Sequence, residues 1–243
     1  MVQDARPPLL YLTHRIPYPP NKGDKVRSFN ILRQLSHTHR VWLGTFVDHP
    51  DDHAHIPALK QWCEQSCVIP IEPRIRRIAS LRGLVSGEAL SLPYYRSPRL
   101  MEWVRRVVGE HDIRAAVAFS GPMAQYLDAP GLARRVVDFC DVDSAKWTQY
   151  AAEHRWPMSW LYRREGARLL DFERAVAQNV DASLFVTAAE ADLFRRVAPE
   201  LGSRVGVMQN GVDADYFAPA NAGDSPYPPG GPVLGFSGAL DSW

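Results

Sequence analysis

The sequence is poor in cysteine, and this excludes a fold held together by disulfides. Only three of its 243 residues are cysteines, so one thiol stays unpaired in any arrangement. The Cys63/Cys67 spacing has no second His/Cys pair near it, which argues against a zinc site. We expect reduced, buried thiols that pack as small apolar side chains.

Long apolar runs and a large net charge are also absent. No stretch reaches the ~18 apolar residues of a membrane span, and the N-terminus has no long apolar signal core. Lys+Arg 28 against Asp+Glu 27 leaves a net charge of +1, which argues against a nucleic-acid partner held by bulk charge. We therefore expect a cytoplasmic protein with no nucleic-acid partner.

The composition that is present is that of a globular protein with a real core. The chain is 46% hydrophobic and 23% charged, which excludes disorder. Short apolar runs alternate with helical patterns, and this predicts an α/β fold: a Rossmann-like parallel sheet with helices on both faces. The expected strands are 9–13, 40–47, 66–71, 115–120, 134–139, 182–186 and 205–209.

The composition changes after Asn210, and this change predicts the domain boundaries. Residues 1–211 are expected to form the Rossmann-like domain. Residues 212–232 are rich in proline and glycine, as linkers are, and 233–243 would be the first strand of a truncated second domain.

The spacing of apolar residues predicts which side chains two helical segments bury. The helix after the first strand is expected to bury Val26 and Phe29. The segment Arg74–Val85 resembles one amphipathic helix, which could cover the sheet or lie on the anionic inner membrane. Trp156 and Trp160, beside a predicted helix break, are expected to pack in the core or between domains. The arginines expected to contact the membrane are Arg74, Arg76, Arg77 and Arg82.

In an open parallel sheet, ligands bind outside the carboxyl ends of the strands. The loop after the first strand ends at Gly23 and opens a helix, whose N–H groups and dipole suit a diphosphate. Lys22 and Arg27 add positive charge. The loop lacks the glycine patterns of the usual dinucleotide and ATP folds, and a proline-stiffened turn with solvated charges is the alternative. The residues assigned to the donor diphosphate are Gly23, Asp24 and Lys25.

The run VVDFCDVDSAKW is the second candidate feature. Close carboxylates repel, which raises the pKa of one and suits it to act as a base or to accept hydrogen bonds from sugar hydroxyls. An Asp-x-Asp cation site and simple helix capping are the alternatives. Asp141 and Asp143 are the candidate catalytic residues. The rest of the expected cleft comprises His14, Arg27, Ser120, Lys146, Thr187, Glu190, Asn210 and Gly211.

Five segments together resemble a known family. They are PYPPNKGDKVRSFNILRQL, DVDSAKW, EGARLLDFERAVAQNVDASLFVTAAEADLF, NGVDADYFAP and LGFSGALDSW, in that order. The chain resembles the acceptor domain of GT-B glycosyltransferases of family 4, and is most similar to the bacterial sugar transferases associated with PEP-CTERM/exosortase exopolysaccharide systems.

The resemblance implies a retaining transfer from a nucleotide-sugar to a glycan or lipid-linked acceptor, with no metal or other cofactor. It implies that Gly23 approaches the donor diphosphate, and it places Asp141 and Asp143 where many relatives carry a histidine. With the donor domain expected to be absent, this chain would hold the acceptor half of the site and be inactive alone. A non-catalytic glycan-binding module, half of a split enzyme and a metal-dependent GT-A transferase are the alternatives.

Overall fold

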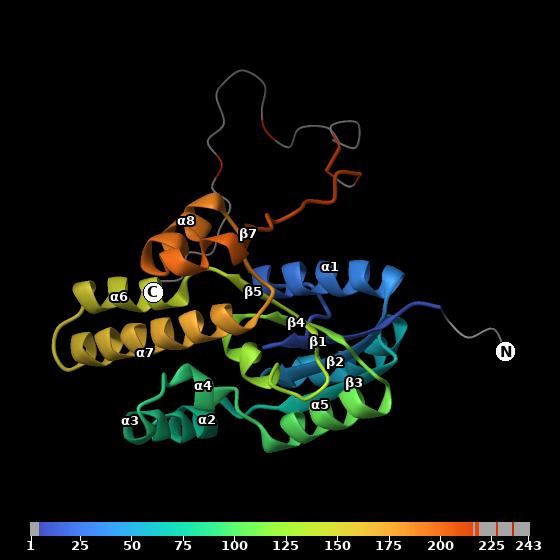
Figure 1. Ribbon diagram of the computed structural model, residues 1–243, viewed down its shortest axis with the longest axis horizontal. Helices are drawn as coiled ribbons and strands as arrows, with labels where there is room; N and C mark the ends of the chain where they lie inside the picture. The colour runs from blue at the N-terminus through green and yellow to red at the C-terminus, as the bar shows by residue number, and fades with distance from the viewer. Residues whose placement is uncertain (1–4, 216, 219–226, 228–234, 236–243) are drawn as a thin grey trace. The chain divides into compact units, whose positions relative to one another are not determined.

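A seven-stranded parallel sheet forms the centre of the protein (Figure 1). The computed structural model describes residues 5–215, 217–218, 227 and 235. Within them the strand order is β3-β2-β1-β4-β5-β6-β7, and every neighbouring pair is parallel. The strands are β1 (Pro8–Thr13), β2 (Arg40–Val47), β3 (Gln65–Pro70), β4 (Ala115–Phe119), β5 (Arg134–Cys140), β6 (Ala182–Phe185) and β7 (Val205–Val207).

Helices connect the strands and cover both faces of the sheet, which confirms the predicted Rossmann-like α/β class. The α-helices are α1 (Gly23–Thr38), α2 (Pro73–Ser80), α3 (Arg82–Ser86), α4 (Ser91–Tyr94), α5 (Pro98–Glu110), α6 (Asp143–Glu153), α7 (Met158–Asn179) and α8 (Ala188–Val197). The 3-10 segments are η1 (Pro50–Gln61), η2 (Gly121–Tyr126) and η3 (Pro199–Arg204).

Two apolar clusters hold these layers together. Because side chains alternate along a strand, Leu10 and Leu12 of β1 join one cluster while Tyr11 joins the other. The first cluster includes Val104 of α5, and the second includes Leu32 of α1. Burial of these apolar side chains is the main favourable contribution to the stability of the fold.

Two helices begin with a side-chain cap. The Ser97 side chain accepts a hydrogen bond from the Leu100 N–H at the start of α5, and Thr187 does the same for the Glu190 N–H at α8. All three cysteines are unpaired; two are buried, whereas Cys140 is half-buried.

Three expectations about faces and helices were wrong. Val26 is exposed, and the buried side of α1 instead carries Lys25 and Ser28 with Phe29 and Leu32. The segment predicted as one helix over 74–85 is divided into α2 and α3, and its apolar side chains are exposed. Trp156 and Trp160 are exposed as well, so the expectation that they pack in the core was wrong, whereas packing between domains stays a prediction.

The chain divides into two units, residues 1–210 and 211–243. Most of the predicted linker 212–232 and nearly all of the predicted strand 233–243 lie outside the described residues, so the proposed domain assignment stays a prediction. Among the described residues, no helix is both long enough and apolar enough to cross a membrane.

Candidate functional site

The strand order places the candidate site between β1 and β4. Connections leave the sheet in opposite directions from these central strands, and in open parallel sheets a ligand crevice lies outside the carboxyl ends at such a point. His14 follows β1, and Ser120 follows β4. The His14 ring stacks on Phe119, the last residue of β4, with 5.7 Å between ring centroids, so the two strand ends are in contact.

The backbone at this edge is strained. Ser120 has a φ of 77° and Cys140 a φ of 66°, and both residues stand at the carboxyl end of a strand. The register between β5 and β6 also shifts between Asp138 and Cys140. Left-handed backbone at residues other than glycine costs free energy and is concentrated at functional sites. The irregular end of β5 leads directly into Asp141 and α6.

His14 and Asp24 form the charged pair nearest to the β1–β4 junction. The Nε2 atom of His14 lies 3.3 Å from Oδ2 of Asp24, and that same oxygen accepts a 2.7 Å hydrogen bond from Arg15. Arg15 also pairs with Asp48, 2.8 Å away. Partial burial disfavours the Asp24 carboxylate, but the hydrogen bond from His14 and the Arg15 charge hold its pKa well below the ordinary value.

Aromatic side chains also contact His14. Tyr95 and the His14 ring form a T-shaped contact with 5.9 Å between ring centroids, in addition to the stacking contact with Phe119. The Nδ1 atom of His14 is buried and has no hydrogen-bond partner among the described residues. A buried polar atom without a partner is uncommon. Sequence reasoning gave His14 only a minor place in the cleft, because a single histidine after a strand does not reveal its partner.

Asp143 is the first residue of α6 and has a perturbed carboxyl group. Its pKa is raised chiefly by burial; Lys146 opposes this shift and Asp141 adds to it, with smaller effects from His14 and Glu190. These electrostatic interactions place Asp143 in one neighbourhood with Lys146 and His14, which are two of the residues expected at the cleft. Asp141 itself is exposed. The pKa of Asp143 is therefore raised, as expected for one of these carboxyl groups, but burial is the main cause and repulsion by Asp141 is a lesser one.

A buried carboxyl group that sequence reasoning missed lies beneath this neighbourhood. Glu173 of α7 accepts a 3.1 Å hydrogen bond from the Ser144 N–H and lies 2.5 Å from the Ser144 hydroxyl. Burial, opposed by these hydrogen bonds and reinforced by Asp143 and Glu190, raises the pKa of Glu173 to about 8. The sequence shows only a single glutamate on the inward face of a long helix, and this does not predict its hydrogen bonds to Ser144.

Two cations expected at the cleft are engaged within the domain. Lys25 is fully buried, and its Nζ atom lies 2.8 Å from Asp52 of η1, so its assignment to the donor diphosphate does not fit this placement. Arg27 bonds both carboxylate oxygens of the buried Asp138 and the Met208 carbonyl oxygen. It also donates a 2.8 Å bond to the side chain of Asn210, which brings two predicted cleft residues together.

Of the remaining candidate residues, some form hydrogen bonds that stabilise the helices, whereas Gly23 is exposed. Thr187 caps α8, and the Glu190 carboxylate accepts a 2.7 Å hydrogen bond from the Val142 N–H at the start of α6. Both residues therefore have a structural role. Gly23 is exposed at the start of α1, and a side chain there would meet no atom within 4 Å. Gly211 belongs to the second unit.

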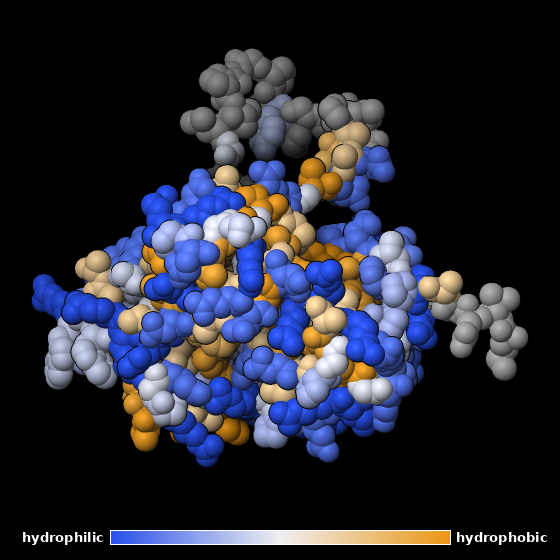
Figure 2. All heavy atoms as spheres, viewed as in Figure 1, coloured by the Kyte–Doolittle hydropathy of each residue, from blue (hydrophilic) through white to orange (hydrophobic). Residues whose placement is uncertain are grey.

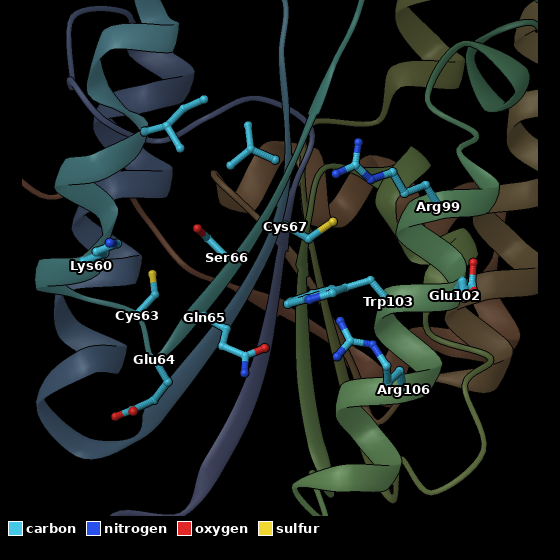
Figure 3. A pocket seen from close by; sticks show the side chains of 12 residues that line it. Lys60, Cys63, Glu64, Gln65, Ser66, Cys67, Arg99, Glu102, Trp103 and Arg106 are labelled. Atoms are coloured by element: carbon cyan, nitrogen blue, oxygen red, sulfur yellow. The ribbon is translucent and has the colours of Figure 1, made fainter.

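A large cavity lies away from this edge. It has a volume of about 720 Å³ and lies between β3, η1 and α5, with Trp103, Arg99 and Arg106 on one side (Figure 3). None of the predicted site residues lines it. Burial raises the pKa of the Cys63 thiol in its wall to about 12, so this thiol is not an activated nucleophile. Nowhere in the described part of the chain do three His, Cys, Asp or Glu side chains gather as potential metal ligands.

Comparison with solved structures supports the fold. Sucrose-phosphate synthase from Thermosynechococcus elongatus matches with a TM-score of 0.54 and 13% identity, over 88% of this chain and 50% of that protein. UGT73P12 from Glycyrrhiza uralensis, solved with glycyrrhetinic acid 3-O-monoglucuronide, gives a TM-score of 0.49 and 11% identity over 87% and 50%. The N-terminal domain of trehalose-6-phosphate phosphatase from Candida albicans gives 0.46 and 10% over 88% and 52%.

These likenesses differ in what they support. The second and third scores are too low to add to the argument, whereas the first shows a shared fold. The chain spans about half the length of the structures that it matches. No family model and no curated protein matches the sequence.

Proposed function

We propose that this chain is the acceptor-side domain of a GT-B glycosyltransferase. The observation that carries the proposal is the sheet, which shares its fold with sucrose-phosphate synthase over 88% of this chain and half of that protein. At the β1–β4 junction, where such sheets bind ligands, His14 and Ser120 stand at the strand ends. The five-segment resemblance to glycosyltransferase family 4 and to PEP-CTERM-associated sugar transferases supports the same proposal.

The proposed reaction moves a sugar from a nucleotide-sugar to a hydroxyl of a glycan or a lipid-linked acceptor in cell-surface polysaccharide synthesis. The bond from the anomeric carbon to the diphosphate breaks, and a bond to the acceptor oxygen forms with the anomeric configuration retained. The acceptor hydroxyl loses its proton. We expect no bound metal, and the nucleotide-sugar is a substrate rather than a cofactor.

Three groups of unit 1–210 are assigned roles in this reaction. Asp143 accepts the hydrogen bond or proton of a sugar hydroxyl, because its raised pKa brings proton exchange closer to neutral pH. His14 is held by Asp24 and contributes a hydrogen bond to the same hydroxyl-rich ligand. The exposed N–H groups at Gly23, at the N-terminus of α1, face the diphosphate.

One observation favours a second candidate, a glycan-binding module without catalysis. Lys25 and Arg27 are engaged in internal ion pairs, so two of the cations expected to stabilise a departing diphosphate are already occupied. A module that binds only the sugar hydroxyls does not need these cations. The carboxylates of Asp141 and Asp143 suit such binding equally well.

The test is a transfer assay on the full-length product of the gene that encodes this chain. A panel of nucleotide-sugars is incubated with glycan and lipid-extract acceptors, and the release of nucleoside diphosphate is measured. We expect release that depends on the acceptor and falls at least about 100-fold in Asp143→Asn. Asp51→Asn, at an exposed position in the first turn of η1, is the control. Glycan binding without release of nucleoside diphosphate would instead support the binding module.

A second assay uses the 243-residue chain. Because this chain spans about half of sucrose-phosphate synthase, we expect it to bind acceptor sugars but to turn over no nucleotide-sugar by itself. Turnover by the purified chain would contradict the assignment of an acceptor half.

A further inference from the structure

Helices α2 and α3 expose apolar side chains and bury small ones. Ile78 is 71% exposed and Val85 is 94% exposed, whereas Ser80 and Gly83 are buried. A Cβ atom on Gly83 would lie 3.1 Å from the Glu88 carbonyl oxygen, so the inner side is tightly packed. The amphipathic pattern is therefore real, but its apolar side faces outward. The outward side chains are Ile75, Ile78, Leu81, Leu84 and Val85.

The turn between α6 and α7 carries a second exposed apolar group. Trp156 is 81% exposed, and Trp160, in the first turn of α7, is 54% exposed. Arg164 follows Trp160 by four residues, so both side chains project from the same face of α7. Arg164 donates hydrogen bonds to the carbonyl oxygens of Gly83 and Glu88 at 2.5 and 3.1 Å, respectively.

These hydrogen bonds place α7 against the α3–α4 segment. Figure 1 shows α2, α3 and α4 grouped beneath α7, and the α6–α7 turn projects at the same end of the unit. We name the combined surface the apolar end patch, defined by Ile75, Ile78, Leu81, Leu84, Val85, Trp156 and Trp160. Soluble domains expose single apolar side chains routinely, but a group of several exposed apolar side chains at one end of a domain marks an interaction surface.

Positive charge borders the apolar end patch. Residues 72–86 contain four arginines and one acidic residue, although the whole chain has a net charge of only +1. Arg74, Arg77 and Arg82 are exposed beside the apolar side chains. Arg76, which the sequence placed with them, donates a 2.7 Å hydrogen bond to the Arg96 carbonyl oxygen and is half-buried. Figure 2 shows orange and blue side chains mixed at the lower left, where α2 and α3 lie.

We propose that the apolar end patch docks this domain on an anionic lipid surface. Isoleucine, leucine and valine side chains enter the acyl boundary, exposed arginines meet acidic headgroups, and tryptophan is the residue type that prefers the interface between them. A second copy of the chain is a poor occupant, because a two-fold contact would bring two arginine-rich surfaces together. The proposal does not depend on the proposed transferase activity.

Vesicle co-sedimentation of the 243-residue chain tests the proposal. We expect binding to phosphatidylcholine vesicles with about one third phosphatidylglycerol, and weak binding to phosphatidylcholine alone. The variant R74Q/R77Q/R82Q should bind the anionic vesicles about 100-fold more weakly, since each interfacial cation contributes about fivefold. I78E/V85E should lose binding by about 100-fold or more, and both changes are at exposed positions that the fold tolerates.

Matched controls separate specific docking from bulk charge. R33Q/R105Q/R196Q removes three exposed arginines from other helices and should bind as the unchanged chain does. Tryptophan emission should shift to the blue on anionic vesicles, and W156F/W160F should abolish the shift.

Any one of several results would overturn the proposal. Four of them are no binding to anionic vesicles at low salt, full binding by I78E/V85E, equal loss in the control triple variant, and a dimer in solution that I78E/V85E dissociates. Displacement from the vesicles by an acidic peptide that still binds I78E/V85E would also overturn it, in favour of a protein partner.

Discussion

Arg27 and Asp138 form a buried ion pair that joins α1 to the end of β5. Nε of Arg27 lies 2.9 Å from one carboxylate oxygen of Asp138, and Nη2 lies 3.2 Å from the other. The remaining guanidinium hydrogens reach the Met208 carbonyl and the Asn210 side chain beyond β7. One side chain therefore connects three elements at the carboxyl edge of the sheet, and the candidate site is built on this connection.

Loss of one partner of this pair should destabilise the domain. Asp138→Asn leaves a buried guanidinium without its counter-charge, and we expect the free energy of unfolding to fall by about 3 kcal/mol. Urea unfolding measures the change. Arg134→Gln removes one partner of the exposed Arg134–Asp181 pair and should cost less than about 1 kcal/mol. An equal loss in the free energy of unfolding for the two variants would show that the buried pair stabilises the domain no more than the exposed pair does.

The Lys25–Asp52 pair can be tested with a double variant. The test decides whether Lys25 has a structural role or binds the donor diphosphate, as the sequence analysis expected. Lys25→Met leaves a nearly buried carboxylate unpaired and should cost about 3 kcal/mol of stability. The double variant K25M/D52L replaces the pair with apolar side chains and should recover to within about 1 kcal/mol of the unchanged chain. Recovery in urea unfolding supports a structural pair. A Lys25→Met variant with unchanged stability would restore the diphosphate assignment.

The sequence predicted the sheet well, because buried parallel strands have a local signal. The predicted bounds of β2 are those observed, and the apolar runs at Pro8–Thr13 and Arg134–Cys140 were located within one residue. The caps at Ser97 and Thr187 have a local signal as well, because a cap depends on residues only three positions apart.

The site was predicted less completely, because its geometry depends on distant residues. Arg27 and Asp138 are 111 residues apart in the sequence, and nothing local to either one specifies the other. The same holds for Glu173 and Ser144, which are 29 residues apart. Helical periodicity predicted an amphipathic segment at 74–85, but periodicity does not say which face is buried when the neighbouring surface is unknown.

The His14–Asp24 pair predicts a graded loss of activity in the full-length gene product. His14→Ala should lower turnover of the nucleotide-sugar by about 100-fold, since it removes a polar group at the β1–β4 junction. Asp24→Asn keeps the shape of the side chain but removes the carboxylate charge that holds Nε2 of His14. We therefore expect a smaller loss of turnover, of about 10-fold. His39→Ala, at a half-buried position directly after α1, is the control. Identical losses for Asp24→Asn and His39→Ala would contradict a positioning role for Asp24.

Glu173 predicts how stability changes with pH. Its pKa is raised from an ordinary 4.5 to about 8, so the folded protein holds a proton on Glu173 that the unfolded chain releases. The resulting stabilisation is fully present below pH ~4.5 and is lost as the pH rises through ~8.

The variant Glu173→Gln tests this dependence, because an uncharged amide has the shape of the protonated acid. The amide oxygen can accept from the Ser144 N–H, as Oε1 of Glu173 does. The amide NH2 group can donate to the Ser144 hydroxyl oxygen, in place of the hydrogen bond that this hydroxyl donates to Oε2 of Glu173. Glu173→Gln should therefore match the unchanged chain at pH 5 and exceed its free energy of unfolding at pH 9 by an amount on the order of 3 kcal/mol. Urea unfolding across this range measures the difference, with the exposed Glu102→Gln as control. Parallel profiles for the unchanged chain and Glu173→Gln would show that Glu173 is already ionised at neutral pH.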